Sequence, residues 1–320
     1  MVQIQRFRFL ITGVTVFLVV GCLGPLPRSD AIPVPPSPAT IPFLPQGPAL
    51  RVLVLGDWGT GGAGQREVAQ AIAATHEDSP PHLVLSVGDN FYEAGVRSPG
   101  EPRVKLLFEY VYAGPFWEDL PFYATLGNHD HWGRPAAQVE YSARNNQWIL
   151  PALHYAFHRP LSNGDSVLFL ALDTDPVTER RPGAKAQLEW ADSILSTPTQ
   201  GWVLAFGHHP FISGGWHSVR GSFSKAMVSL LAGRSHVYVA GHNHSTELIQ
   251  SESGLPQLVC GGAGGLDNAY RVRAVEGTLA AYTNGGWCLL HIQPEVMAIE
   301  LYDRAGGLQY RHLLERTPVR

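Results

Sequence analysis

The chain has 320 residues, of which 45% are hydrophobic and 16% are charged, and its formal net charge is −4. This length accommodates one large α/β domain or two small ones, and the composition is that of a globular protein. The negative net charge gives no electrostatic reason to expect a nucleic acid as partner or scaffold. Three cysteines in a chain of this length are too few for a disulfide framework.

The first 21 residues have the pattern of a signal peptide. Arg6 and Arg8 precede an apolar run over residues 9–20, which is too short to cross a membrane comfortably. The run ends in VVGC, which resembles the lipobox of bacterial lipoproteins. The resemblance implies cleavage before Cys22, attachment of lipid to its sulfur, and export to the bacterial cell envelope, on its periplasmic or outer face. Ordinary secretion with cleavage at another bond is the alternative.

The segment after Cys22 has the composition of a tether. Residues 23–48 contain nine prolines and almost no charge, which favours an extended polyproline-type segment between a lipid anchor and a domain. The sequence therefore predicts a signal peptide over 1–21, a lipidated cysteine with its tether over 22–48, and one folded domain over 49–320.

Apolar runs alternate with helical patterns from residue 50 onward. Runs over 51–57 and 82–89 predict buried strands on either side of a helix over 66–77, and such a βαβ unit implies a parallel sheet. The segment after residue 255 holds three strand patterns without a helix, which predicts antiparallel strands that form a second sheet. Further helices are predicted near 101–113, 184–196 and 224–233, and further strands near 121–128, 153–160, 165–175, 201–209 and 236–244.

Five of the predicted strands end in a glycine that is followed directly by residues able to bind metals: GDWG, GDNFY, GNHDH, GHHP and GHNH. One such strand end is often only a turn, but the carboxyl ends of parallel strands converge on one crevice, so five of them indicate a site. The set combines oxygen donors and imidazoles without a thiolate, which suits iron, zinc or manganese. The candidate ligands are Asp57, Asp89, Tyr92, Asn128, His208, His242 and His244. Seven ligands are too many for one ion, but two ions that share a carboxylate would use them all.

These five motifs, in this order, resemble those of the calcineurin-like metallophosphoesterases. The tyrosine of GDNFY makes the chain similar to the purple acid phosphatases, and the motifs LGNHDHWG, FGHHP and VAGHNH are similar to the small, tartrate-resistant type. The resemblance implies an α/β fold in which two packed mixed β-sheets are flanked by helices, an αββα sandwich. It implies that the first metal is bound by Asp57, Asp89, Tyr92 and His244, and the second by Asp89, Asn128, His208 and His242.

The resemblance also implies the cofactors and the reaction. The first ion would be Fe³⁺, to which the tyrosinate gives a purple colour, and the second Fe²⁺, Zn²⁺ or Mn²⁺. A metal-bound hydroxide would attack a phosphomonoester. His129 and His217 match the two substrate histidines of the family, and Asp130 is expected to orient His129. The five positive charges of the two ions exceed the four negative ones of two aspartates, a tyrosinate and a hydroxide, so the site would attract an anionic phosphate.

Two alternatives stay open. Phosphodiesters or phosphoproteins are possible substrates because a two-metal site does not dictate the leaving group. A non-catalytic surface lipoprotein with the same fold is the rival of a different class, although such a protein would be expected to lose ligands or substrate histidines, and none is missing. The expected partners are a phosphate ester and, through the lipid anchor, a membrane, with a monomeric chain. His131 and His209 lie beside likely ligands but are expected to pack or to be solvated, and Cys260 and Cys288 are expected to be buried thiols.

Overall fold

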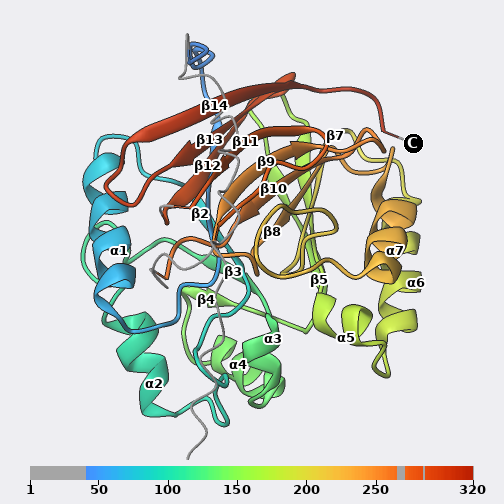
Figure 1. Ribbon diagram of the computed structural model, residues 1–320. Helices are drawn as coiled ribbons and strands as arrows, with labels where there is room; N and C mark the ends of the chain where they lie inside the picture. The colour runs from blue at the N-terminus through green and yellow to red at the C-terminus, as the bar shows by residue number, and fades with distance from the viewer. Residues whose placement is uncertain (1–40, 265–270, 284, 320) are drawn as a thin grey trace, which may run out of the picture. The chain divides into compact units, whose positions relative to one another are not determined.

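The predicted strands are arranged in two mixed β-sheets in the computed structural model, which describes residues 41–264, 271–283 and 285–319 (Figure 1). The predicted signal peptide over 1–21, Cys22 and the tether up to residue 40 lie outside the described residues. All described residues belong to one unit, Pro33–Arg320. Within the described part of the chain, no helix combines the length and the apolar character that a membrane span requires.

The first sheet has the strand order β14-β13-β12-β1-β2-β3-β4. Its strands β1 to β4 are parallel, and β12 joins them antiparallel to β1, with Val54 opposite Cys288. The bounds are β1 Leu50–Leu55, β2 Leu83–Val87, β3 Phe122–Thr125, β4 Trp148–Ile149, β12 Trp287–Ile292, β13 Val296–Tyr302 and β14 Leu308–Glu315.

The second sheet has the order β11-β9-β10-β8-β7-β6-β5. Strands β6, β7, β8 and β10 are parallel neighbours, and β5, β9 and β11 are antiparallel to the strands beside them. The bounds are β5 Tyr155–Pro160, β6 Ser166–Ala171, β7 Gly201–Phe206, β8 Val237–Ala240, β9 Thr246–Gln250, β10 Pro256–Cys260 and β11 Thr278–Tyr282.

Helices cover the outer faces of both sheets, as Figure 1 shows for α1 on one side and α6 and α7 on the other. In β6, the side chains of Val167 and Phe169 belong to the core between the sheets, whereas Leu168 and Leu170 pack with the helices. This alternation is the period-two pattern of a strand buried on both faces. The helices are α1 Ala63–Thr75, α2 Pro102–Val104, the π-helix η1 Lys105–Glu109, α3 Asn128–His131, α4 Pro135–Ser142, α5 Thr174–Glu179, α6 Ala184–Leu195 and α7 Gly221–Leu231. The expected αββα sandwich is therefore confirmed.

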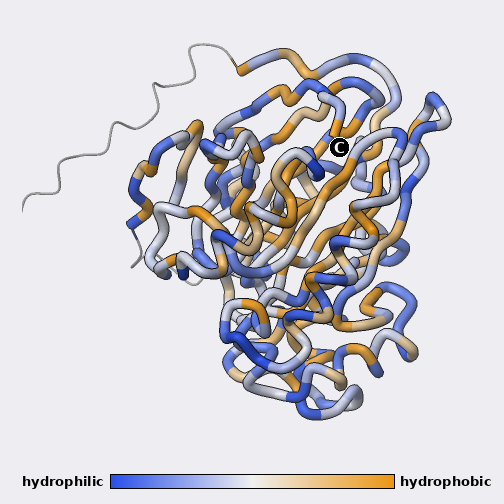
Figure 2. The backbone as a smooth tube through the Cα atoms, turned by 90° about the vertical axis from the view of Figure 1, so that its right-hand side faces the viewer, coloured by the Kyte–Doolittle hydropathy of each residue, from blue (hydrophilic) through white to orange (hydrophobic). Residues whose placement is uncertain are grey.

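The hydropathy of the chain follows this layering. Figure 2 shows hydrophobic residues concentrated in the interior of the fold and hydrophilic residues in many of the loops around it. Cys260 and Cys288 are both buried free thiols, in agreement with the expectation from the sequence.

The prediction for the segment after residue 255 was wrong in one respect. The strands after residue 255 do not form a second sheet of their own, because β10 pairs in parallel with β8, whereas β12 to β14 extend the first sheet beyond β1. A hydrophobic pattern identifies a strand but does not say which sheet edge it joins. The helix predicted near 101–113 is also shorter, since regular structure there covers only α2 and η1.

Candidate metal centre

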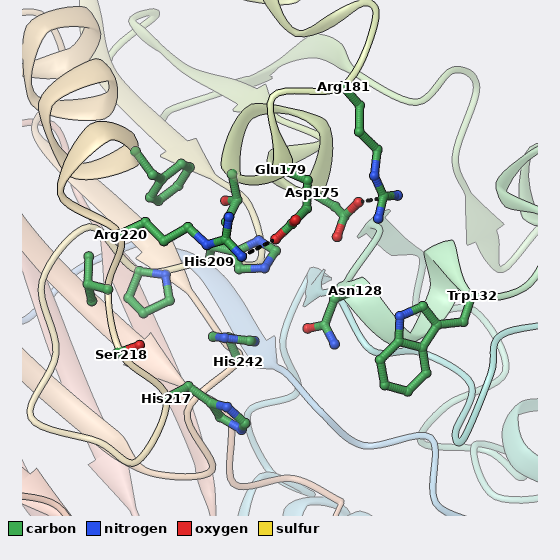
Figure 3. A pocket seen from close by; sticks show the side chains of 14 residues that line it. Asn128, Trp132, Asp175, Glu179, Arg181, His209, His217, Ser218, Arg220 and His242 are labelled. Atoms are coloured by element: carbon green, nitrogen blue, oxygen red, sulfur yellow. Dashed lines mark ion pairs between the residues drawn. The ribbon is translucent and has the colours of Figure 1, made fainter.

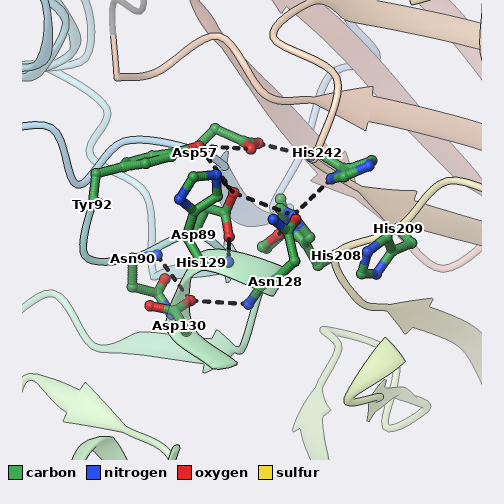
Figure 4. A network of polar contacts seen from close by, with 12 residues as sticks. Asp57, Asp89, Asn90, Tyr92, Asn128, His129, Asp130, His208, His209 and His242 are labelled. Carbon is green, nitrogen blue, oxygen red and sulfur yellow. Dashed lines mark hydrogen bonds and ion pairs between the residues drawn. The ribbon is translucent and has the colours of Figure 1, made fainter. Parts of the chain in front are cut away.

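The carboxyl ends of β1, β2, β3, β7 and β8 bring the expected ligands together (Figure 4). Each strand is followed within two residues by a glycine and then by polar residues. The structure thereby gathers all seven residues that the sequence predicts as metal ligands, from parts of the chain up to 187 positions apart: Asp57, Asp89, Tyr92, Asn128, His208, His242 and His244.

One set of donors surrounds the phenol of Tyr92. Its hydroxyl donates hydrogen bonds to Asp57 Oδ1 at 3.2 Å and to Asp89 Oδ2 at 3.0 Å, and it lies 3.3 Å from His244 Nε2. The same imidazole nitrogen lies 3.7 Å from Asp57 Oδ1. These four side chains are the expected ligands of the first metal.

The second set surrounds the imidazole of His208. Its Nε2 atom lies 3.1 Å from Asn128 Oδ1, 3.2 Å from His242 Nδ1 and 3.4 Å from Asp89 Oδ2. Its other nitrogen, Nδ1, lies 2.9 Å from the carbonyl oxygen of Val87, which fixes the ring orientation. Asp89 belongs to both sets, so it occupies the position of a carboxylate that two ions share.

Two motif glycines are required by close approach. A side chain at Gly127 would place its Cβ atom 2.1 Å from Asp89 Oδ1, and one at Gly88, where φ is +89°, would place it 2.6 Å from His208 Nδ1. Any larger residue would therefore collide with an expected ligand.

The charges of the site are unbalanced when the protein groups are considered alone. Burial, reinforced by the neighbouring Asp89 carboxylate, raises the pKa of Asp57 well above its ordinary value, although His208 opposes this rise. Burial and both carboxylates raise the pKa of the Tyr92 phenol. Burial also lowers the pKa of His244 to about 4. Asp57 and Tyr92 thus resist ionisation and the imidazole of His244 resists protonation in the absence of added positive charge, whereas the charge of His208 lowers the pKa of Asp89 despite its burial.

The pKa of His208 is shifted in the opposite direction from that of His244. Burial disfavours its protonation, yet the carboxylates of Asp89 and Asp57 raise its pKa to about 10. A protonated imidazole at this place supplies the positive charge that the carboxylates require. Buried oxygen donors and imidazoles that converge in this way fit metal cations, since cations would neutralise the acids and leave the imidazoles neutral.

The two expected substrate histidines lie beside these sets. His129 Nδ1 is 2.5 Å from the carbonyl oxygen of Glu93, and its Nε2 is 4.0 Å from Asp89 Oδ2. The ring of His217 lies 4.5 Å from that of His242 and 6.1 Å from that of His244, between ring centroids. Both imidazoles can therefore reach a group bound at the metal positions.

Asp130 does not orient His129, contrary to the expectation from the sequence. Its buried carboxylate accepts hydrogen bonds from the backbone N–H groups of Gly127 and Asn90, at 2.9 and 3.0 Å, and from the side chain of Gln138 at 2.7 Å. Successive residues of a helix such as α3 point in directions about 100° apart, so Asp130 faces the interior while His129 faces the site. Asp130 joins the loops after β2 and β3, and the Glu93 carbonyl orients His129.

The sequence did not identify Asp173 and Thr174 as contributors to the site, and it predicted His131 and His209 only as packed or solvated residues. His131 Nε2 lies 2.8 Å from Asp173 Oδ1, and Thr174 Oγ1 lies 2.9 Å from Nδ1 of the buried His209. Through these contacts the loops after β3 and β7 are joined to the end of β6. His209 also forms a possible ligand group with His208 and His242. The signal was weak because Asp173 and Thr174 follow their strand without a motif glycine.

A pocket of about 400 Å³ opens beside the donor sets (Figure 3). Asn128, His217 and His242 line it on the side of the metal centre. Trp132, Arg181 and Arg220 line it farther out, where Arg220 pairs with Glu179 at 3.0 Å and Arg181 with Asp175 at 2.7 Å. The pocket can therefore hold a molecule that extends from the metal positions past an aromatic ring and two guanidinium groups.

Two mixed sheets whose strand ends hold two donor sets with a shared carboxylate define a class of proteins, the dinuclear metallohydrolases. The comparisons with known proteins agree, since the sequence profile of the calcineurin-like phosphoesterases matches residues 50–246. The chain belongs to this family.

Relatives extend the similarity over most of the chain. Tartrate-resistant acid phosphatase type 5 of Sus scrofa is 30% identical over 299 residues, which cover 84% of this chain and 88% of that protein. Purple acid phosphatase 3 of Arabidopsis thaliana is 28% identical over 280 residues, covering 79% and 74%. The solved structure of GAP50, described as the anchor in the inner membrane complex of Plasmodium, shares the fold with a TM-score of 0.77 at 22% identity, over 86% of this chain and 91% of that one.

Proposed function

We propose that the protein is a dinuclear metal-dependent acid phosphatase that hydrolyses phosphomonoesters. The observation that carries this proposal is the convergence of seven donor side chains in two sets that share Asp89. The position of His129 and His217 beside these sets and the names of the relatives, which are acid phosphatases, support it further.

The residues divide between the two ions. Asp57, Asp89, Tyr92 and His244 would hold Fe³⁺, since a phenolate suits a trivalent ion, and Asp89, Asn128, His208 and His242 would hold Fe²⁺, Zn²⁺ or Mn²⁺. When bound, two such ions clamp a phosphoryl group and lower the pKa of water.

His129 has the geometry of a general acid. The Glu93 carbonyl can only accept a hydrogen bond, so the Nδ1 atom of His129 carries a proton and donates it there. The proton that is exchanged with the substrate is therefore the one on Nε2, which faces Asp89 and the site. His129 would pass this proton to the leaving oxygen of the ester, and His217 would bind the phosphate.

The leaving group would occupy the outer part of the pocket. A monoester fits because its phosphoryl group can lie beside Asn128 and His217 while the rest of the molecule extends toward Trp132 and Arg220. Phosphodiesters and phosphoproteins would use the same metal centre, and the substrate panel below separates them.

We place the protein at the bacterial cell envelope, exported and anchored through lipid on Cys22, as a monomer. The charge pattern of residues 1–21, the VVGC sequence and the proline-rich segment over 23–48 support this location. GAP50 is described as an anchor. A protein that served only as an anchor would not need to keep metal ligands. The presence of all seven donors favours catalysis.

The decisive experiment combines metal analysis with kinetics. Purified wild-type protein is expected to bind two ions per chain and to hydrolyse an aryl phosphomonoester faster than the matching diester or a phosphopeptide. Asp89→Asn is expected to lose metal and activity together, because Asp89 belongs to both donor sets. The exposed Asp119, when changed to Asn, serves as the control for a lost carboxylate. A metal-loaded wild-type protein that hydrolyses none of the phosphoesters would overturn the proposal.

A further inference from the structure

His217 lies on a loop, residues 207–220, that has no helix or strand of its own between β7 and α7. A residue that must face a bound phosphate from such a loop needs its backbone held in one conformation, because loops are the more mobile parts of a fold. Thr174 of α5 holds the start of this loop, and side chains of the second sheet and of the β8–β9 connection hold the part that leads to His217.

Glu247 of β9 lies beneath the loop and is fully buried. Its carboxylate accepts hydrogen bonds from the hydroxyl of Ser213 and the backbone N–H of Gly214, at 2.7 and 2.8 Å. A third bond, also of 2.7 Å, comes from the hydroxyl of Ser245. Two of the three donors belong to the loop, so the carboxylate would lose most of its partners if the loop moved away.

Asn243 holds the loop next to His217 itself. This residue is fully buried and lies between the expected ligands His242 and His244. Its Oδ1 accepts the backbone N–H of His217 at 2.7 Å, and its Nδ2 donates to the hydroxyl of Ser213 at 2.7 Å. A Cβ atom on Gly215 would lie 2.4 Å from Asn243 Cγ, so the loop backbone packs directly against the amide.

Glu247, Ser213 and Asn243 therefore form a continuous chain of hydrogen bonds, which we call the loop clamp. Buried polar groups are tolerated only when they are paired, and leaving one without its partner is destabilising. Any movement of the loop would break several of these bonds at once, since Ser213 contacts both other members. The clamp thus gives the loop a single favoured conformation.

We propose that the loop clamp positions His217 for binding the phosphate group and couples it to the strand end that carries His242 and His244. Asn243, Ser213 and Glu247 are positioning residues, because they act through His217 and their described contacts are with the loop and its neighbours. The inference rests on the proposed function, in which His217 contacts the phosphate.

The first test uses Ser213→Ala, the change in the clamp that is farthest along the chain from the metal ligands. It leaves Glu247 and Asn243 one partner short, so we expect KM for an aryl phosphate and the inhibition constant of inorganic phosphate to rise together, by about tenfold. The content of metal and kcat should change by less than about threefold. The matched control is Ser222→Ala, because Ser222 is an exposed serine in the first turn of α7. Unchanged phosphate affinity or lost metal in Ser213→Ala overturns the proposal.

A double-mutant cycle then tests whether the clamp acts through His217. If it does, Ser213→Ala should have little further effect on phosphate affinity in a protein that already carries His217→Ala. Effects that add fully in the double variant contradict the proposal. Glu247→Gln, which keeps the size of the side chain, should reproduce the pattern of Ser213→Ala and repeats the test should that variant fold poorly.

The outcome also separates this inference from the proposed function. If His217→Ala binds phosphate as the wild type does, the assigned role of His217 is wrong and the proposed function must be revised. If His217→Ala weakens phosphate binding but neither clamp variant does, His217 keeps its role and only the clamp is refuted.

Discussion

At the scale of single residues, the two carboxylates of the metal centre, Asp57 and Asp89, each have a second role. Asp57 Oδ1 faces Tyr92, while its Oδ2 accepts the backbone N–H of His242 at 2.8 Å. Asp89 Oδ2 faces both donor sets, while its Oδ1 accepts the backbone N–H of His129 at 2.9 Å. One oxygen of each is thus directed to the metal positions and the other fixes the residue that carries the next functional group.

These hydrogen bonds hold part of the backbone of the site in an unfavourable conformation. Asp57, Asp89 and His242 have positive φ angles of 58°, 52° and 70°, a region that costs of order 1–3 kcal/mol for residues other than glycine. Such conformations persist only where the surroundings determine them. Replacing Asp57 by Ala should therefore misplace His242 as well as remove a ligand.

The neighbours Asn128 and His129 are expected to respond differently to substitution. Asn128→Ala removes an oxygen that lies 3.1 Å from His208 Nε2, so metal content and activity should fall together. His129→Ala removes a group that is no expected ligand, so both ions should stay while kcat falls about 10²- to 10⁴-fold. Metal analysis on the samples used for kinetics checks both expectations.

The leaving group provides the control for this pair. Esters with good leaving groups need less protonation, so the effect of His129→Ala should be smaller on aryl phosphates than on alkyl phosphates. Loss of a metal ion from His129→Ala, or full activity of that variant on alkyl phosphates, would contradict the division of roles between the two residues.

Tyr92 should determine the colour of the purified protein. A phenolate bound to ferric iron gives a broad absorption band in the visible range, and Tyr92→Phe should remove most of that band. The fold should survive, because Phe keeps the ring that lies 4.5 Å from His129. Visible spectra and circular dichroism of both proteins check this. A colourless wild-type protein that contains two zinc ions under oxidising conditions would show that the first ion is not iron.

At the scale of elements, β12 to β14 are joined by a buried charge cluster. Glu300 of β13 is 1% exposed and accepts hydrogen bonds from Arg311 Nε of β14 at 2.6 Å and from Tyr302 Oη at 2.7 Å, and it lies 2.9 Å from His291 Nε2 of β12. Burial alone would raise the pKa of Glu300, but its hydrogen bonds and the charges of its neighbours outweigh this and lower it. The cluster therefore stabilises the fold while Glu300 is ionised.

The lowered pKa of Glu300 determines how the stability of the fold depends on pH. Because the pKa of Glu300 is lower in the folded than in the unfolded chain, its contribution is fully present above pH about 4.5 and is lost as the pH falls through the folded pKa. Glu300→Gln should reduce the free energy of unfolding by about 3 kcal/mol at pH 7, and by less at pH 3. Denaturant titrations at both pH values measure this difference. Glu252→Gln, at an exposed site, should have almost no effect, and a Glu300→Gln effect that grows on acidification would refute the argument.

Elements differ in how far the sequence predicts them. The strands β1, β2, β7 and β8 were predictable because they are apolar runs, interrupted only by Arg51 and Ser86, that a glycine follows directly. The short helix α3 was not, since its four residues NHDH carry no hydrophobic period. The donor sets followed from the motifs, but the direction of Asp130 and the contact between His131 and Asp173 did not. Those depend on which way a side chain points and on which strands meet across the two sheets.

At the scale of the whole molecule, the described residues 41–49 and the metal centre lie at opposite ends of β1. The described end of the tether runs beside β12, where Gln293 Nε2 donates to the carbonyl oxygen of Gln46 at 3.0 Å. The chain then enters β1 at Leu50 and reaches Asp57 at the other end. Seven residues of extended chain span roughly 23 Å, so the tether meets the sheet well away from the pocket.

This arrangement leads to the last prediction. If Cys22 carries lipid, wild-type protein should incorporate labelled fatty acid and fractionate with membranes, whereas Cys22→Ala should incorporate none and should be soluble or held as precursor. Once released, Cys22→Ala should hydrolyse a soluble aryl phosphate at the wild-type rate, because the described chain enters β1 at its amino end and the donors lie at its carboxyl end. Cys260→Ala, a change at a buried cysteine, controls for the loss of a thiol. Wild-type protein that takes up no fatty acid and fractionates as a free soluble species would show that export proceeds without a lipid anchor.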